Sequence, residues 1–263
     1  MDPLNHGIVL IGAGNVGSQL GAALHKEGYF ISQVYSKTKG SADKLAKKLN
    51  ATAINDLKKI NTSASVFIIA VPDDAIESVA KQLRVKDKIV VHTSGTADMK
   101  ILKSTSKNYG VFYPLQTFSK DIPVNFKTVP ICVEGSNKKT AESLLYFAKS
   151  ISKNVEKVDS DERKKLHLAA VFACNFSNHM YAVADVFLKK NKLSFDLLRP
   201  LIEETTAKMK TNEPSQTQTG PALRGDKKTM NAHLKLLSKD KKLQSIYEVL
   251  SESIVAVSKK NKS

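Results

Sequence analysis

The sequence has few of the residues that a disulfide-stabilised or metal-dependent protein needs. Only two of its 263 residues are cysteine, Cys132 and Cys174, and none is tryptophan. The two cysteines lie in separate apolar runs, without a Cys-x-x-Cys spacing or a nearby cluster of other ligands. This pattern predicts buried, reduced thiols and no metal site.

Long hydrophobic segments are also missing. No apolar run approaches the ~20 residues that span a bilayer, and the N-terminus has no charged segment followed by the hydrophobic core of a signal peptide. We therefore expect a cytoplasmic protein that does not enter a membrane.

Acidic residues are scarce relative to basic ones. The 41 Lys and Arg residues exceed the 25 Asp and Glu residues, which gives a formal charge of +16. The lysine pairs are scattered and not interleaved with aromatic residues, so they predict solvated surface and no specific nucleic-acid partner. The excess positive potential would instead attract anionic cofactors and substrates.

The N-terminal segment carries a glycine motif that follows an apolar run, residues 7–11, and opens a predicted helix, residues 15–26. In a dinucleotide fold Gly12 permits the tight turn, Gly14 lets the backbone approach the phosphates, and Gly17 brings the helix close to the sheet. The helix N-terminus then faces the pyrophosphate. The predicted contacts of this turn are Gly12, Gly14, Asn15, Val16 and Gly17.

The end of the second predicted strand, residues 29–35, indicates which dinucleotide is bound. An NAD enzyme usually has an acidic residue here, to bind the ribose 2′-hydroxyl. This chain has Ser36, Lys37 and Thr38, whose hydroxyls and ammonium suit a 2′-phosphate. We predict NADP as the cofactor; the alternative is that Lys37 is one more solvated lysine.

The remaining pattern predicts an α/β protein, with a doubly wound, parallel Rossmann sheet followed by an all-helical domain. The expected boundaries are 1–159 for the NADP-binding domain and 160–263 for a helical substrate and dimerisation domain. Further strands are predicted at 65–71, 88–92, 109–113, 128–134 and 155–159. Helices are predicted at 41–49, 74–83, 138–151, 161–190, 194–211, 228–238 and 241–258.

Two predicted strands end in loops that could carry chemistry. Val71 and Pro72 occupy a position beside the adenosine and pyrophosphate, and we expect them to line the cofactor. His92 ends the next strand and precedes Ser94 and Gly95, where an imidazole, hydroxyls and backbone amides could bind a substrate. The alternative for this second loop is a helix cap with His92 satisfied in the core.

The predicted helix 161–190 has two different faces. One face is apolar, and we expect it to be core: Phe172, Phe176, Met180, Val183 and Phe187. The other presents His167, Asn175 and Asn178, a mixture that indicates a cleft or a partner subunit rather than solvent. His167 is a candidate proton donor, and the two asparagines are candidate substrate ligands.

Near the C-terminus, a Gly-Pro-Ala-Leu-Arg-Gly-Asp segment, residues 220–226, joins two predicted helices. Arg224 could bind a substrate anion through its guanidinium. It could equally hold the turn through an ion pair with Asp226.

Together, four segments give the chain a resemblance to a known family: residues 12–17, 92–96, 114–118 and 220–226. The chain resembles bacterial Rossmann-like proteins whose second half is the domain-of-unknown-function 2520 family, described as NADP oxidoreductases. This group is similar in architecture to pyrroline-5-carboxylate reductase and 6-phosphogluconate dehydrogenase. The resemblance implies a Rossmann domain, a helical domain of the 6-phosphogluconate dehydrogenase C-terminal type, NADP, and a homodimer formed through the helical domain.

The chain also departs from these relatives. The Lys-x-x-x-Asn pair of the hydroxyacid branch is missing, because Lys164 and Lys165 are followed four residues later by Leu168 and Ala169. Comparable proteins often have His where Tyr113 stands.

These patterns favour an NADP-dependent oxidoreductase that transfers a hydride between nicotinamide and a small anionic carbonyl or imine substrate in an interdomain cleft. His167 or His92 would supply the proton, and Ser94, Gly95, Asn175, Asn178 and Arg224 would position the substrate. The alternative is a non-catalytic NADP-binding module that senses redox state or binds a partner.

Overall fold

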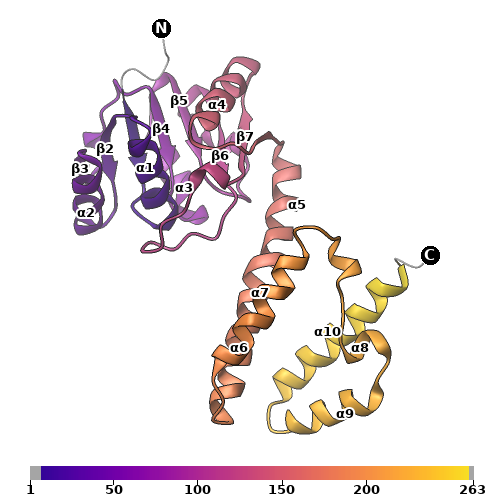
Figure 1. Cartoon of the computed structure of the whole chain (residues 1–263). Coiled ribbons are helices and arrows are strands. Elements are labelled where there is room, and N and C mark those ends of the chain that lie inside the picture. Colours follow the sequence, from indigo (N-terminus) through magenta and orange to yellow (C-terminus); the bar gives the residue numbers. More distant parts are fainter. Residues whose placement is uncertain (1–6, 261–263) are drawn as a thin grey trace. The chain divides into compact units, whose positions relative to one another are not determined.

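A computed structural model describes residues 7–260 of the chain, which form two compact units (Figure 1). The first unit reaches His179 and the second begins at Met180. The predicted domain boundary after residue 159 marks the end of the strands. The compact first unit also takes in the first turns of the long helix that follows.

The first unit is an eight-stranded sheet with the strand order β3-β2-β1-β4-β5-β6-β7-β8. Its strands are β1 (Ile8–Ile11), β2 (Ile31–Tyr35), β3 (Thr52–Ile54), β4 (Val66–Ile69), β5 (Lys86–His92), β6 (Ser106–Pro114), β7 (Ile131–Gly135) and β8 (Val155–Lys157). The first six strands have the order 3-2-1-4-5-6, which is the Rossmann arrangement. The sequence pattern predicted seven of the eight strands and missed the three-residue β3.

Two strands, β7 and β8, run opposite to the other six. β7 pairs antiparallel with β6, whereas every other neighbouring pair in the sheet is parallel. The connection between β6 and β7 contains only a short 3-10 turn, η3 (Phe126–Thr128), and no crossover helix. Because a parallel return needs a crossover connection, the chain comes back antiparallel, and the prediction of a wholly parallel sheet was wrong here.

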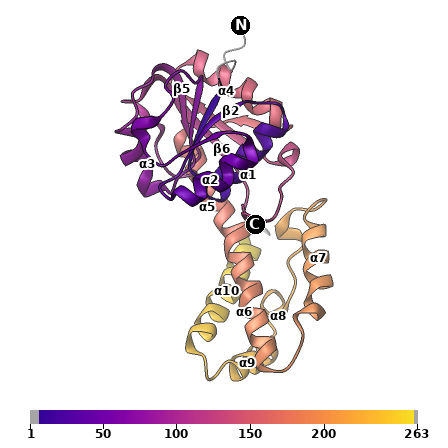
Figure 2. The ribbon, with the colours of Figure 1, turned by 90° about the vertical axis from the view of Figure 1, so that its left-hand side faces the viewer.

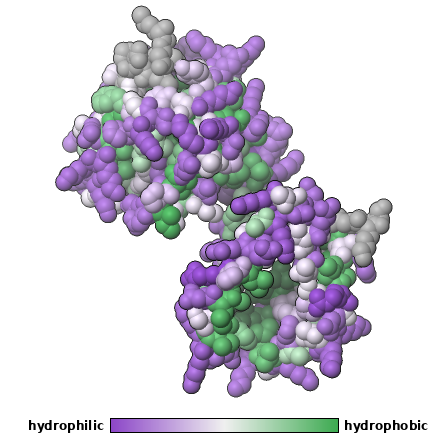
Figure 3. Space-filling model, in the orientation of Figure 1, coloured by the Kyte–Doolittle hydropathy of each residue, from purple (hydrophilic) through white to green (hydrophobic). Residues whose placement is uncertain are grey.

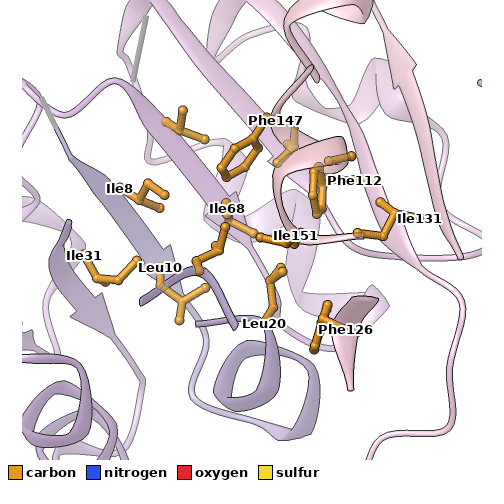
Figure 4. Close-up of a cluster of buried hydrophobic side chains, with 14 of the residues drawn as sticks. Ile8, Leu10, Leu20, Ile31, Ile68, Phe112, Phe126, Ile131, Phe147 and Ile151 are labelled. Carbon is orange, nitrogen blue, oxygen red and sulfur yellow. The ribbon is translucent and has the colours of Figure 1, made fainter. Parts of the chain in front are cut away.

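Helices cover both faces of this sheet. They are α1 (Asn15–Lys26), α2 (Lys39–Leu49), α3 (Asp73–Ala80) and α4 (Lys138–Ile151), with short turns η1 (Leu57–Lys59) and η2 (Met99–Leu102). Alternate strand residues face opposite cores: Leu10 packs with α1, α2 and α4, whereas Ile11 packs with α3 and the η turns. Figure 4 shows the first of these cores, with Leu10 near Leu20 and with Phe112 and Phe147 close together.

The long helix predicted at 161–190 forms, but with a change in its winding. It consists of α5 (Ser160–Ala170), a π-helical segment η4 (Val171–Phe176) and α6 (Ser177–Lys190). Asp159 and Glu162 form a reciprocal capping box at its start. π-helical segments occur frequently at functional sites, and this one carries Asn175.

Two expectations about this helix were wrong. Phe172 and Phe176 are 61% and 51% exposed, so they are not core residues of the single chain. Cys174 is exposed, whereas Cys132 is buried as predicted. Both errors have the same cause: an apolar helix face was assigned to the core of this chain, although no element within residues 7–260 covers it.

The second unit is helical (Figures 1 and 2). After most of α6 it contains η5 (Phe195–Leu198), α7 (Arg199–Lys208), η6 (Pro214–Gln216), α8 (Pro221–Arg224), α9 (Lys227–Leu236) and α10 (Lys241–Lys260). His233 on α9 and Tyr247 on α10 are joined by a 2.9 Å hydrogen bond. Within residues 7–260, no helix combines the length and apolar character that crossing a bilayer requires.

Candidate functional site

The turn between β1 and α1 has the shape that a dinucleotide requires. Gly12 has φ of 123°, and a Cβ there would lie 2.1 Å from the carbonyl oxygen of Ala70. A Cβ on Gly17 would lie 2.1 Å from the Gly12 carbonyl oxygen, so these two glycines are fixed by packing. A Cβ on Gly14 would meet nothing within 4 Å. Packing alone therefore does not require glycine at position 14, whereas close approach of a phosphate would.

The start of α1 suits an anion. Its N-cap is Gly14, no side chain caps the first turn, and this turn has no acidic residue. The backbone N–H groups of Asn15 and Val16 are thus available to a pyrophosphate. The Asn15 side chain binds the protein itself: its Nδ2 donates to the Phe118 carbonyl oxygen at 3.0 Å. The predicted cofactor turn is therefore tied directly to the loop after β6.

The residues predicted to contact the adenosine end lie at the carboxyl ends of neighbouring strands. Ser36, Lys37 and Thr38 follow β2, and Lys37 and Thr38 are exposed. Thr38 is the N-cap of α2, but its side chain makes no capping bond. Val71 and Pro72 follow β4, which pairs with β1. This arrangement leaves both groups of side chains open to a ligand at this edge of the sheet.

His92, one of the two candidate proton donors, is closed to substrate. Its ring is completely buried, its Nδ1 accepts the Ser94 backbone N–H at 3.2 Å, and its Nε2 has no partner among the described residues. Burial, followed by the nearby positive charge of Arg163, lowers the pKa of His92 to about 4. A neutral, inaccessible imidazole is a poor proton donor, so the structure corrects this part of the expectation and favours His167.

The hydroxyl of Ser94 is committed to the protein. It donates to Asp73 Oδ2 at 2.7 Å and accepts the backbone N–H groups of Thr96 and Ala97 at 3.0 and 2.9 Å. Thr96 also donates to Asp73. Because Ser94 has no donor left for a ligand, its predicted role as a substrate contact is replaced by a structural one.

A fully buried arginine holds this loop against the long helix. Arg163, on α5, pairs with Glu134 on β7 and donates to the carbonyl oxygen of Ala97. Ser160 donates to the same carboxylate at 2.8 Å. The ion pair is almost fully shielded from solvent, and it fixes α5, β7 and the loop after β5 relative to one another.

This framework brings His167 against Tyr113. His167 Nδ1 lies 3.0 Å from the Tyr113 hydroxyl, and a Cβ on Gly95 would lie 2.5 Å from the same nitrogen. Gly95 thus serves close packing against the imidazole. Burial raises the pKa of Tyr113 to about 12, so its phenol stays protonated at neutral pH.

A cavity of about 340 Å³ opens beside this pair. It is lined by Tyr113, Leu115, Gln116, Thr117, Phe118, His167, Ala170, Val171, Cys174 and Asn175. His167 and Asn175, both predicted, are therefore brought together, whereas Asn178 does not line the cavity. Besides the imidazole of His167, the lining has apolar, amide, hydroxyl and thiol groups, but no lysine, arginine, aspartate or glutamate.

Arg224 lies in the second unit and is exposed. It makes no ion pair with Asp226 or any other described residue, so the alternative of an Arg–Asp turn is not observed. Asp226 instead caps α9 by accepting the Thr229 backbone N–H at 3.0 Å. A substrate role for Arg224 stays a prediction.

The sequence analysis missed four residues of this site: Asp73, Tyr113, Glu134 and Arg163. Asp73 follows Pro72, the N-cap of α3, and lies in the first turn of that helix. Arg163 and Glu134 are 29 residues apart, and nothing in their local sequence indicates that they meet. The one available signal was Tyr113, which ends a strand next to the Pro-Leu-Gln-Thr-Phe segment.

Comparison with known proteins agrees with this architecture. A Rossmann-like domain matches residues 2–116, and the domain of unknown function DUF2520 matches residues 129–254. A Bacteroides fragilis protein described as a "putative NADP oxidoreductase" is 44% identical, with 95% of this chain and 98% of that chain covered and a TM-score of 0.91. The chain therefore belongs to the family of Rossmann-like proteins with a DUF2520 C-terminal domain, as its motifs predicted.

More distant solved structures share the fold. A reductive aminase from Aspergillus terreus, in complex with NADPH, has 12% identity and a TM-score of 0.71, with 95% of this chain and 94% of that chain covered. An imine reductase from Myxococcus stipitatus, in complex with NADP⁺, has 17% identity and a TM-score of 0.60, with coverage of 97% and 93%. No curated protein matches the chain.

Proposed function

We propose that this protein is an NADP-dependent oxidoreductase that transfers a hydride between the nicotinamide and a small carbonyl or imine compound. The observation that carries the proposal is the turn at Gly12, Gly14 and Gly17, where packing accounts for the first and third glycines and the space beside the second is open to a ligand. The 44% identical Bacteroides fragilis protein, described as a "putative NADP oxidoreductase", supports this proposal.

His167 is the proposed proton donor. It lines the cavity, is partly exposed, and its Nε2 makes no hydrogen bond to a described residue. His92 is excluded from this role by its burial. Asn175, which lines the same cavity, is placed to bind the substrate heteroatom through its amide.

The cavity sharpens the substrate class. Since its lining carries no cation, the substrate part that reaches His167 is uncharged, because burying an unpaired carboxylate is costly. An anionic group on the substrate would need a cation from elsewhere, and Arg224 is the candidate for that role. A neutral carbonyl or imine next to an apolar substituent fits the wall formed by Leu115, Phe118 and Val171.

The test is turnover of a panel of carbonyl and imine compounds, followed by NADPH absorbance. For any compound that the wild type turns over, His167→Gln should lower kcat by about 10²-fold or more. NADPH binding should be unchanged in this variant. His179→Gln, an exposed histidine outside the cavity, is the matched control. Equal activity of His167→Gln and wild type would exclude His167 as the donor. NADPH binding without turnover of any compound would favour the non-catalytic, redox-sensing alternative.

We also propose a homodimer formed through the helical part of the chain. Leu197, Leu201, Leu236 and Val249 are each at least 60% exposed, and a cavity of about 430 Å³ between α9 and α10 is lined by Met230, Leu234 and Val255 among others. Figure 3 shows hydrophobic residues gathered around a hollow in the helical unit. Apolar surface of this extent indicates association, and an equivalent helical surface on a second copy would cover it.

A further inference from the structure

We propose that Tyr113 is the positioning residue of the proton donor: its hydroxyl donates to His167 Nδ1 and thereby keeps the proton of the neutral imidazole on Nε2. This inference rests on the proposed function, since it assigns how the donor in that site is held. Nothing in the glycine motif or the family resemblance requires it.

The first step is geometric. The 3.0 Å contact joins the phenol oxygen to Nδ1 and not to Nε2. Tyr113 is buried at the end of β6, where it packs with Val111 and Cys132, so its ring has little freedom to leave. The hydroxyl has no other hydrogen-bond partner among the described residues. The contact with Nδ1 is therefore the one hydrogen bond that this hydroxyl makes within residues 7–260.

The second step concerns which group gives the proton. A phenol whose pKa is raised to about 12 stays protonated through the physiological range, so it offers Nδ1 a stable donor. When Nδ1 accepts, the proton of a neutral imidazole must be on Nε2, because the two ring nitrogens share one proton. That leaves an N–H donor on the nitrogen that no described residue engages.

The proton balance of a carbonyl reduction follows from this arrangement. Hydride adds to the carbonyl carbon, and the developing alkoxide takes the proton from Nε2. The hydroxyl proton of Tyr113 moves to Nδ1 at the same time, so no imidazolate forms. The starting state returns when this proton moves back to the phenolate oxygen and a proton from water binds Nε2. An alkoxide is a stronger base than a phenolate, so the net proton transfer from Tyr113 through His167 to the alkoxide is favourable.

A substitution at Gly95 provides an independent test of the contact between Tyr113 and His167. An added Cβ would lie 2.5 Å from His167 Nδ1 and 3.0 Å from Tyr113 Cζ. Gly95→Ala should therefore displace the imidazole from the phenol while both side chains remain present. It acts on the hydrogen bond without deleting either partner.

The experiment is nitrogen-15 NMR of the full chain with labelled histidine, which reports the tautomer directly and needs no substrate. The His167 signals are assigned by their loss in His167→Gln. We expect wild-type His167 at pH 8 to be the Nε2–H tautomer alone, with a Tyr113 hydroxyl proton that shows scalar coupling to Nδ1. Tyr113→Phe keeps the ring and its packing, and it should give a mixture of tautomers and no coupling. Gly95→Ala should do the same.

A wild-type spectrum with the proton on Nδ1, or identical tautomer populations in wild type and Tyr113→Phe, would overturn the inference. Either result would leave NADPH turnover and the His167→Gln effect unaffected, so failure of the inference is distinguishable from failure of the proposed function. Once a substrate is found, solvent isotope effects add a second readout. Two protons should move in the wild type, and only one in Tyr113→Phe.

Discussion

The two units of the chain differ sharply in how they bury apolar side chains. Every buried apolar residue that the structure describes lies between Ile8 and Ile151, with the single exception of Ala222. The first unit therefore builds its own two cores, one on each face of the sheet. The helical unit leaves large side chains exposed, such as Leu197 at 70% and Val249 at 60%. The first unit thus has a core of its own, and the exposed apolar side chains of the second are the surface that the proposed homodimer would cover.

The largest expected effect is in the first unit. Phe67 on β4 is completely buried, and Phe67→Ala should lower the free energy of unfolding by about 3–5 kcal/mol. Phe30, which is 64% exposed, provides the matched control, and Phe30→Ala should cost far less. Denaturant unfolding at two protein concentrations measures both. Equal losses for the two variants would contradict a self-contained core.

In the helical unit, a charge should act on association instead. Val249→Glu places a carboxylate on the exposed apolar face of α10, where an interface would leave it buried and unpaired. We expect light scattering to show a dimer for wild type and a monomer for this variant, with NADPH binding retained. Lys47→Glu, an exposed site on α2, should stay dimeric. A wild-type monomer at all concentrations would refute the dimer.

A smaller effect concerns pH and the core of the first unit. His92 takes up a proton near pH 6.5 when unfolded but only near pH 4 when folded. Between these values the unfolded state binds more protons, so lowering the pH destabilises the fold, by about 2 kcal/mol between pH 7 and pH 5. His92→Gln should flatten this part of the stability profile. An unchanged profile in His92→Gln would show that His92 is not the group responsible.

The smallest predicted effect is on cofactor choice. Lys37 is exposed after β2 and forms no ion pair within the described residues. If it binds the 2′-phosphate, Lys37→Ala should weaken NADPH binding roughly tenfold, the value of a modest charge-assisted hydrogen bond, and leave NADH binding unchanged. Lys47→Ala is the control for a general loss of positive charge. Equal weakening of both coenzymes would show that Lys37 is only a solvated lysine.

The comparison also explains how much the sequence could predict. The glycine turn and most strands were predictable because they depend on local spacing: three glycines at fixed positions, and β-branched runs such as Val66–Ile69. The direction of β7 was not predictable in this way, because it depends on the absence of a crossover helix between β6 and β7. The apolar face at Phe172 and Phe176 was recognised, but periodicity alone does not say which chain covers it.

The site divides in the same way. His167 and Asn175 were predictable as polar residues on one helix face. Their surroundings were not, since Tyr113 meets His167 across 54 residues of sequence and Arg163 meets Ala97 across 66. Such contacts depend on the tertiary packing of α5 against the sheet. The same packing buries His92 and engages the Ser94 hydroxyl in hydrogen bonds within the protein. These two residues therefore leave the predicted site.

The most direct test of the central claim is calorimetric titration of NADPH into the wild-type protein and Gly14→Val. Position 14 has room for a side chain, so the variant should fold with an unchanged melting temperature. We predict saturable heat for the wild type, with NADPH bound more tightly than NADH, and binding at least tenfold weaker in Gly14→Val. The absence of heat from both coenzymes with wild-type protein, or equal affinity in the folded variant, would contradict a phosphate seated on the turn at the start of α1.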